Sequence, residues 1–200
     1  NATEKGWVKK HKIYSDIPVG TRGYFFNMRE WPFDDKRVRY AFSYLYDRKK
    51  INRELMYNEM VPIHSQYSNS PYENPNNEKF NYNPQKAIEL LRDAGYTKRN
   101  SDGWLVQEGT GKELRFEINI YKSLEDRVTT LQQMLKEYGI DMQIKFMDFN
   151  SIIKNVNERN FKITSFGYSG LAFPNPETSM QSSLADKNNN KDEAITEIYK

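Results

Sequence analysis

The chain has 200 residues, of which 37% are hydrophobic and 28% are charged, a composition typical of a folded chain with one domain or slightly more. Its 30 basic and 27 acidic residues are interspersed and leave a net charge of +3, which is too weak a bias to indicate a nucleic-acid partner. The absence of cysteine excludes disulfides, thiolate metal sites and cysteine nucleophiles, and no apolar run is long enough to predict a membrane span.

The first quarter of the chain predicts an extended segment followed by two short helices. Residues 23–27 combine aromatic side chains with a glycine and favour a strand. Asp34 or Asp35 can then cap a helix, because a short carboxylate accepts hydrogen bonds from the free N–H groups of a first turn. Apolar residues at helical spacing form one face of this helix: Val38, Ala41, Phe42 and Leu45. Asp47 offers the cap of the second helix.

An irregular segment and a well-marked helix follow. Residues 57–82 are rich in Asn, Ser and Pro, and their prolines exclude a helix. A connection this long is uncommon inside a compact domain, so we interpret it as a segment that wraps around the domain. Asn83 predicts a helix cap, Pro84 suits the first turn, where its missing N–H costs nothing, and Gly95 can end the helix in a left-handed conformation.

The second half of the chain predicts a parallel α/β unit. Residues 104–107, the turn at 109–111 and residues 114–121 favour a hairpin. Patterns of strand, helix, strand, helix and strand then alternate over 114–166, and crossover helices of this length favour a parallel sheet with right-handed connections. Ligands of such sheets bind outside the carboxyl ends of the strands. Residues 166–170, which leave the last strand, are therefore predicted to form a cleft wall.

No residue pattern indicates catalysis. Asp34 and Asp35 could serve as paired carboxylates in acid–base chemistry, but we interpret them as helix caps. The two histidines, His11 and His64, do not form a spaced ligand set, and no phosphate-binding loop occurs, so we predict no catalytic residue, no metal and no cofactor. The 14 Tyr, 11 Phe and 3 Trp can line a ligand cleft or fill the core.

Three ordered stretches carry a resemblance to a known family. The first is Asn27, Pro32-Phe33-Asp34-Asp35, Arg37-Val38-Arg39, Ala41, Asp47-Arg48 and Ile51. The second is Tyr82-Asn83-Pro84-Gln85-Lys86-Ala87, Leu90-Leu91 and Ala94-Gly95-Tyr96, and the third is Tyr138-Gly139-Ile140 with Asp148. Together they resemble the extracellular or periplasmic solute-binding proteins of peptide-type ABC importers (family 5, similar to oligopeptide- and dipeptide-binding proteins). The resemblance runs from about Gly23 to about Ser183.

The resemblance implies an α/β lobe of the type II periplasmic-binding-protein kind, with a mixed sheet built on the strand–helix–strand–helix–strand unit. Residues 1–30 would be lead-in strands that continue from a missing first lobe, residues 31–183 the second, ligand-binding lobe, and residues 184–200 a truncated return helix. The chain would then be a fragment of an exported, monomeric protein, periplasmic or on the cell surface, whose parent carries a signal peptide. A lipid anchor in the parent stays open.

The implied function is capture of a peptide or peptide-like solute between two lobes and its delivery to the membrane permease of an ABC importer. The resemblance places the ligand against Tyr168, Ser169, Gly170 and Leu171, together with Ser165, through backbone hydrogen bonds and roomy side-chain pockets. Several relatives carry an aspartate just after this point, whereas residues 171–176 of this chain contain no acid, which puts recognition of a free amino terminus in doubt. Two alternatives remain: a carboxylate-dependent hydrolase domain, and a protein-interaction module that uses residues 57–82.

Overall fold

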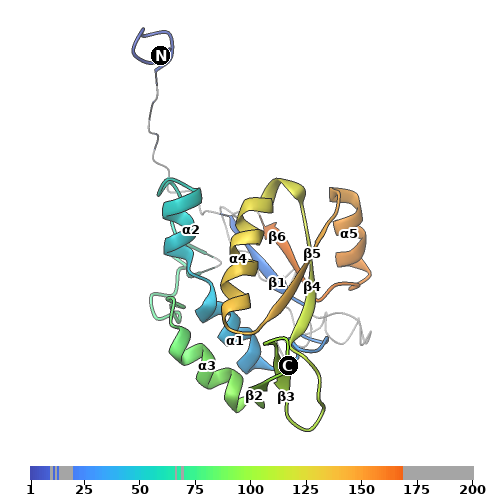
Figure 1. Ribbon diagram of the computed structural model, residues 1–200. Coiled ribbons are helices and arrows are strands. Elements are labelled where there is room, and N and C mark those ends of the chain that lie inside the picture. The colour runs from blue at the N-terminus through green and yellow to red at the C-terminus, as the bar shows by residue number, and fades with distance from the viewer. Residues whose placement is uncertain (10, 12, 14–19, 66, 69, 169–200) are drawn as a thin grey trace, which may run out of the picture.

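The computed structural model describes residues 1–9, 11, 13, 20–65, 67–68 and 70–168. Its centre is a four-stranded sheet in the order β1-β6-β4-β5 (Figure 1). The strands are β1 (Thr21–Phe26), β4 (Arg115–Ile120), β5 (Asp141–Phe146) and β6 (Ile163–Tyr168). β4 runs parallel to β5 and to β6, whereas β1 is antiparallel to β6. The predicted mixed sheet with its parallel unit is therefore confirmed.

Five α-helices accompany this sheet within the described residues. They are α1 (Lys36–Leu45), α2 (Arg48–Leu55), α3 (Pro84–Asp93), α4 (Glu125–Glu137) and α5 (Phe149–Asn157). α4 joins β4 to β5 and α5 joins β5 to β6, as the alternating pattern predicts. Asp148 caps α5 by accepting a hydrogen bond from the backbone N–H of Ser151, and Gly139 follows α4 with φ +80°. None of the described helices is long and apolar enough to cross a membrane.

The main core lies where α1 and α4 pack against the sheet. Alternate residues of β4, namely Phe116, Ile118 and Ile120, are buried. The fully buried ring of Phe33 lies 4.8 Å from the ring of Phe116 and 4.7 Å from the ring of Phe26. The helices contribute the apolar faces predicted from their spacing: Val38, Ala41, Phe42 and Leu45 from α1, and Val128, Leu131 and Leu135 from α4. Removal of these side chains from water is the main stabilising contribution to the fold.

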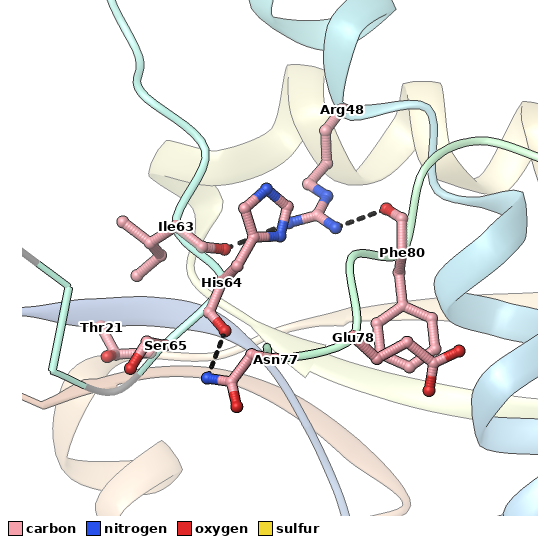
Figure 2. Close-up of a pocket in the computed structure, with 8 residues that line it drawn as sticks. All are labelled: Thr21, Arg48, Ile63, His64, Ser65, Asn77, Glu78 and Phe80. Atoms are coloured by element: carbon pink, nitrogen blue, oxygen red, sulfur yellow. Dashed lines mark hydrogen bonds between the residues drawn. The ribbon is translucent and has the colours of Figure 1, made fainter. Parts of the chain in front are cut away.

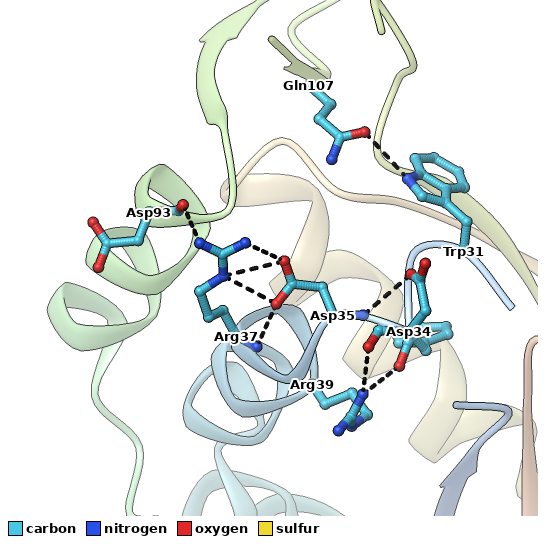
Figure 3. A network of polar contacts seen from close by, with 8 residues as sticks. Trp31, Asp34, Asp35, Arg37, Arg39, Asp93 and Gln107 are labelled. Carbon is cyan, nitrogen blue, oxygen red and sulfur yellow. Dashed lines mark hydrogen bonds and ion pairs between the residues drawn. The ribbon is translucent and has the colours of Figure 1, made fainter. Parts of the chain in front are cut away.

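A polar network connects the start of α1 to the end of α3 (Figure 3). The carboxylate of Asp35 caps α1, because it accepts a hydrogen bond from the backbone N–H of Arg37 at 2.8 Å and further bonds from the Arg37 guanidinium. The same guanidinium donates to the carbonyl oxygen of Asp93. Among the described residues, the carboxylate of Asp34 accepts only the backbone N–H of Asp35, at 3.1 Å. Both aspartates therefore serve backbone N–H groups, and Asp35 is the predicted cap.

The predicted hairpin over residues 104–121 is confirmed only next to its turn, where residues 105–107 pair with residues 112–114. β3 (Leu105–Gln107) pairs with β2 (Tyr96–Arg99), a strand that the sequence analysis did not predict. An antiparallel bridge between Val106 and Glu113 links β3 to the chain that leads into β4. Backbone hydrogen bonds from Leu114 to Leu105 at 2.7 Å and from Gln107 to Lys112 at 2.9 Å flank it. The pairing stops there because β4 enters the main sheet, where its alternate side chains are buried in the core.

The described residues of the segment 57–82, which we call the wrapping segment, contain neither helix nor strand, as predicted. Asn52 of α2 fixes its first part, because the side-chain amide donates to the carbonyl oxygen of Met60 at 2.8 Å and accepts the N–H of Met60 at 3.0 Å. At its far end, the ring of Phe80 contacts the ring of Tyr44 edge-on at 5.2 Å. Side-chain clasps and one aromatic anchor thus hold this segment against α1 and α2.

Candidate functional site

The carboxyl ends of β4, β5 and β6 meet at one edge of the sheet, which we call the carboxyl edge. It comprises residues 120–122, 146–149 and 168, together with Thr21, whose backbone pairs with Tyr168 where β1 begins. Crossover connections bring every parallel strand back to the same starting edge, so their ends lie together. Since ligands of parallel α/β sheets bind outside such an edge, a ligand site is expected here.

An open cavity of about 330 Å³ adjoins the carboxyl edge at Thr21. This volume lies at the lower end of the range for small-ligand sites. Three parts of the chain that are far apart in the sequence form the walls: the start of β1, the first residue of α2 and the wrapping segment. The lining residues are Thr21, Arg48, Ile63, His64, Ser65, Asn77, Glu78 and Phe80 (Figure 2). The side-chain amide of Asn77 donates to the carbonyl oxygen of His64 at 3.0 Å and so fixes the two arms of the wrapping segment to each other.

Arg48 gives the cavity its positive charge. The guanidinium is half-buried and donates to two backbone carbonyl oxygens, that of Phe80 at 2.6 Å and that of Ile63 at 3.4 Å. Within the described part of the chain, no carboxylate lies within ion-pair distance of it. Burial lowers the pKa of Arg48, but an arginine remains cationic at neutral pH. The cavity wall therefore carries a half-buried cation that no carboxylate of the described residues neutralises.

His64 lies beside Arg48 in the same wall (Figure 2). Its pKa is lowered, first by burial and then by the charges of Arg48 and Lys79, while Glu73 acts in the opposite direction. A histidine with a pKa below its ordinary value of about 6.5 is mostly neutral at pH 7. At that pH the imidazole offers one N–H donor and one acceptor rather than a second positive charge.

Glu78 is the one acidic side chain among the described lining residues, and its carboxylate is engaged elsewhere. It accepts a hydrogen bond from the hydroxyl of Tyr44 at 2.8 Å and lies 3.9 Å from the ammonium group of Lys86. Figure 2 shows this carboxylate turned away from Arg48. Because its charge is shared with Lys86 and with water, Glu78 offsets the field of Arg48 only in part.

Aromatic side chains cover another part of the carboxyl edge. The rings of Tyr121 and Phe149 stack at 6.2 Å with an interplanar angle of 17°, and Phe149 is 62% exposed. The ammonium group of Lys122 lies 4.6 Å from the centre of the Phe146 ring. The sequence analysis singled out neither Tyr121 nor Phe149 as a residue that contacts a ligand. The structure instead presents flat apolar surface to solvent at the ends of β4 and β5.

The predicted ligand residues lie only partly within the described structure. Ser165 is half-buried on β6, directly opposite Tyr24 of β1. The backbone of Tyr168 is the last pair of the β1–β6 ladder, opposite Thr21, and so reaches the edge of the cavity. Ser169, Gly170 and Leu171 lie outside the described residues. The end of β6 is thus adjacent to the cavity, as the cleft-wall prediction requires of that strand.

The sequence analysis did not bring Thr21, Arg48 and His64 together. Arg48 belonged to a motif, and His64 was considered only as a metal ligand. Residues 57–82 were recognised as a wrapping segment, but no sequence signal told which helix they return to. Within the described residues, no group of three or more His, Asp and Glu side chains is placed to hold a metal ion. The described side chains offer charge, hydrogen bonds and aromatic surface to a ligand.

The chain is similar in sequence to known proteins over most of its length. Residues 3–191 match the family model described as "Bacterial extracellular solute-binding proteins, family 5 Middle". The chain is 27% identical over 171 residues to the oligopeptide-binding protein AppA of Bacillus subtilis, which covers 82% of this chain and 31% of that protein. It is 25% identical over 200 residues to a probable peptide-binding protein, YejA, of Agrobacterium fabrum, covering 82% of this chain and 32% of that one.

Solved structures show the same fold. The structure of AppA from Bacillus subtilis in complex with a nonapeptide superposes with a TM-score of 0.73 at 25% identity, over 84% of this chain and 34% of that one. NikZ from Campylobacter jejuni in complex with Ni(L-His) gives 0.72 at 22% identity, over 90% and 36%. These likenesses confirm the predicted α/β lobe of the type II periplasmic-binding-protein kind. The chain spans about a third of the length of the curated relatives that it matches.

Proposed function

Because the chain belongs to family 5 of the bacterial extracellular solute-binding proteins, we propose that it forms the ligand-binding lobe of the substrate-binding component of an ABC importer. The proposed ligand is a peptide or peptide-like solute. The observation that carries this proposal is the likeness to AppA, which was solved with a nonapeptide, combined with an open cavity at the carboxyl edge of the sheet. The task is capture and delivery, without a chemical step.

The proposed mechanism is closure of two lobes around the ligand. This chain spans about a third of its relatives, and its cavity is open, so contacts from a second lobe would complete the enclosure. Closure is a hinge motion, and the ligand favours the closed state because only that state offers both sets of contacts. In this layout, residues 31–183 form the lobe, residues 1–30 enter it from the first lobe, and residues 184–200 return toward it.

We place the ligand backbone along the end of β6. Tyr168, Ser169, Gly170 and Leu171 would offer backbone hydrogen bonds to an extended ligand, and Ser165 would contribute from within the strand. The adjacency of Tyr168 to the cavity through Thr21 supports this placement. Since residues 171–176 contain no acid, a longer, blocked or conjugated peptide fits better than a short one held by its free amino group.

The proposed partner is the membrane permease of the importer, and the proposed location is the periplasm or the cell surface. Support comes from relatives such as the probable ABC transporter-binding protein of Deinococcus radiodurans, which is 25% identical over 154 residues. We propose a monomer, since one ligand between two lobes of one chain needs no second copy. Attachment through a lipid in the parent is a further proposal that rests on the family alone.

Native mass spectrometry of the whole protein tests the proposed function. We expect a population of bound peptides or peptide-like molecules, released on unfolding and identified by fragmentation. A protein that purifies without such ligands, and that binds no member of a mixed peptide library, would contradict the proposal.

A bulky substitution tests the placement along β6. Gly170→Trp should lower peptide affinity at least about tenfold by filling the groove, which corresponds to the loss of one or two good contacts. Thr110→Trp, in an exposed turn before the amino end of β4, should leave affinity unchanged. Equal affinity in the two variants would remove these residues from the site.

A further inference from the structure

We propose that the cavity at the carboxyl edge binds a carboxylate group of the ligand, held by the Arg48 guanidinium and the Thr21 hydroxyl. This inference rests on the proposed function, because it names the chemical group of a peptide-like ligand that this lobe recognises. It also applies to a part of the lobe, the floor between β1, α2 and the wrapping segment, that lies beyond the end of β6.

The first support is the unused hydrogen-bonding capacity of Arg48. A guanidinium has five N–H donors, and two of them reach the carbonyl oxygens of Ile63 and Phe80, so three have no acceptor among the described residues. The two carbonyl contacts fix the plane of the group at the cavity wall. A fixed, half-buried fork of donors suits a planar carboxylate, which accepts two parallel hydrogen bonds from it.

The second support is an orphaned hydroxyl on the opposite side of the cavity. The side-chain oxygen of Thr21 is buried and has no hydrogen-bond partner in the described part of the chain, and Thr21 lines the cavity. Leaving a buried hydroxyl without a partner is unfavourable. In the structure this oxygen is closed to solvent, so a ligand acceptor would bind it after rotation of the Thr21 side chain toward the cavity, and the new hydrogen bond would relieve the cost. Thr21 and Arg48 come from different elements, and the cavity is the space that they share.

The charges around the cavity favour an anion. No carboxylate of the described residues pairs with Arg48, Lys79 contributes a further positive field to the same wall, and Glu78 is engaged with Tyr44 and Lys86. An incoming carboxylate would supply the counter-charge that Arg48 does not receive from the described part of the chain. In a partly dehydrated site this attraction is stronger than on an open surface.

A ligand carboxylate has two sources, the carboxyl terminus of a peptide or an acidic side chain within it. Calorimetry on the whole protein separates them with two pairs of probes. The first pair is N-acetyl-pentaalanine and its C-terminal amide. The second pair consists of C-terminal amides of N-acetyl-Ala-Ala-Glu-Ala-Ala and N-acetyl-Ala-Ala-Gln-Ala-Ala. A preference of at least about tenfold for the charged member is expected in one of the two pairs, the size typical of a hydrogen bond to a charged group. Equal affinities in both pairs would overturn the proposal.

Two variants assign the preference to the cavity. Arg48→Gln and Thr21→Val should each reduce the charged-to-neutral affinity ratio toward one. Arg53→Gln, an equal loss of charge at an exposed position on the same helix, should leave the ratio unchanged. Thr21→Val keeps the shape and strand preference of the residue, so an unchanged thermal midpoint would show that its effect is not unfolding. A ratio preserved in both cavity variants would place the carboxylate elsewhere.

A direct probe keeps this inference separate from the proposed function. If no peptide binds, the peptide proposal fails. The cavity is then decided by titrating sodium acetate into the whole protein with ¹⁵N-labelled arginine. A saturable shift of the Arg48 Nε–H resonance that is lost in Thr21→Val, with sodium chloride at equal ionic strength as the reference, supports the carboxylate site. A response no different from that to chloride overturns it.

Discussion

Asp34 and Asp35 are adjacent residues of the same type, but their side chains make very different contacts. Asp35 caps α1 and binds the Arg37 guanidinium, whereas exposed Asp34 accepts one backbone N–H. We therefore expect Asp35→Ala to lower the free energy of unfolding by about 1–2 kcal/mol, the usual loss for an N-cap. Asp34→Ala, the matched control, should change it by less than about 0.5 kcal/mol. Urea denaturation at pH 7 measures both, and equal effects would contradict the assigned roles.

The same contact carries a pH dependence of known sign. The hydrogen bond from Arg37 lowers the pKa of Asp35 below its ordinary value. A carboxylate whose pKa is lowered by folding stabilises the fold above the pKa of the unfolded chain, about 4, and loses that contribution as the pH falls through the lower folded pKa. The difference between the wild type and Asp35→Asn should therefore be constant above about pH 5 and should shrink steadily below about pH 4. A difference that grows on acidification would reverse the assignment.

At Gly139, both a positive φ and a close neighbouring backbone atom disfavour any residue with a Cβ. Its φ is +80°, and an added Cβ would lie 2.9 Å from the carbonyl oxygen of Gly103. Gly109 has nearly the same φ, +79°, with nothing within 4 Å of the added atom. Gly109→Ala should cost about 1 kcal/mol through φ alone, and Gly139→Ala at least about 1 kcal/mol more, because a backbone atom must shift. Denaturation midpoints test this, and similar costs would show that the contact yields freely.

At the scale of elements, the sequence predicted helices and strands well where the spacing of apolar residues agreed with capping residues and turn residues. Asp35, Asp47 and Asn83 cap helices in the structure, as their positions predicted, and Asp148 caps α5. The alternating apolar residues of β4 form its buried face. Local signals failed for β2, whose four residues include only one that is buried, Tyr96. The partner of β2 is β3. This pairing depends on β4 lying in the four-stranded sheet, which the local sequence of β2 does not indicate.

The wrapping segment depends on a few side-chain clasps rather than on a core of its own. Asn52 holds Met60 through both backbone groups, at 2.8 and 3.0 Å. Asn52→Ala should raise amide hydrogen exchange over residues 57–65 by about thirtyfold, since the two lost bonds contribute about 1 kcal/mol each. Asn74→Ala is the control within the same segment, because its side chain accepts only the N–H of Asn76. Exchange over 57–65 that is unchanged in Asn52→Ala would mean that other contacts hold this arm.

At the scale of the whole molecule, the sequence predicted the edge of the sheet but not the residues around the cavity. Right-handed parallel connections fixed the edge at which β6 ends, and the backbone of Tyr168 pairs there with Thr21, which lines the cavity; the role of Tyr168 in binding stays a prediction. The floor of that cavity joins Thr21, Arg48 and His64, which are contributed by β1, α2 and the wrapping segment. Such a juxtaposition depends on where an irregular segment returns. The motif containing Arg48 marked the family, but its unpaired charge became visible only in three dimensions.

In the proposed mechanism, the binding free energy is divided between the two lobes that close around the ligand. A micromolar complex corresponds to about −8 kcal/mol, and half of that value corresponds to about millimolar affinity. Calorimetry on the 200-residue chain alone should therefore detect no binding tighter than about millimolar for short peptides, whereas the whole protein should bind them in the micromolar range or better. The control is the unfolding transition of the isolated chain, which shows that the lobe is folded during the titration. Micromolar binding by a folded, isolated lobe would contradict closure as the source of affinity.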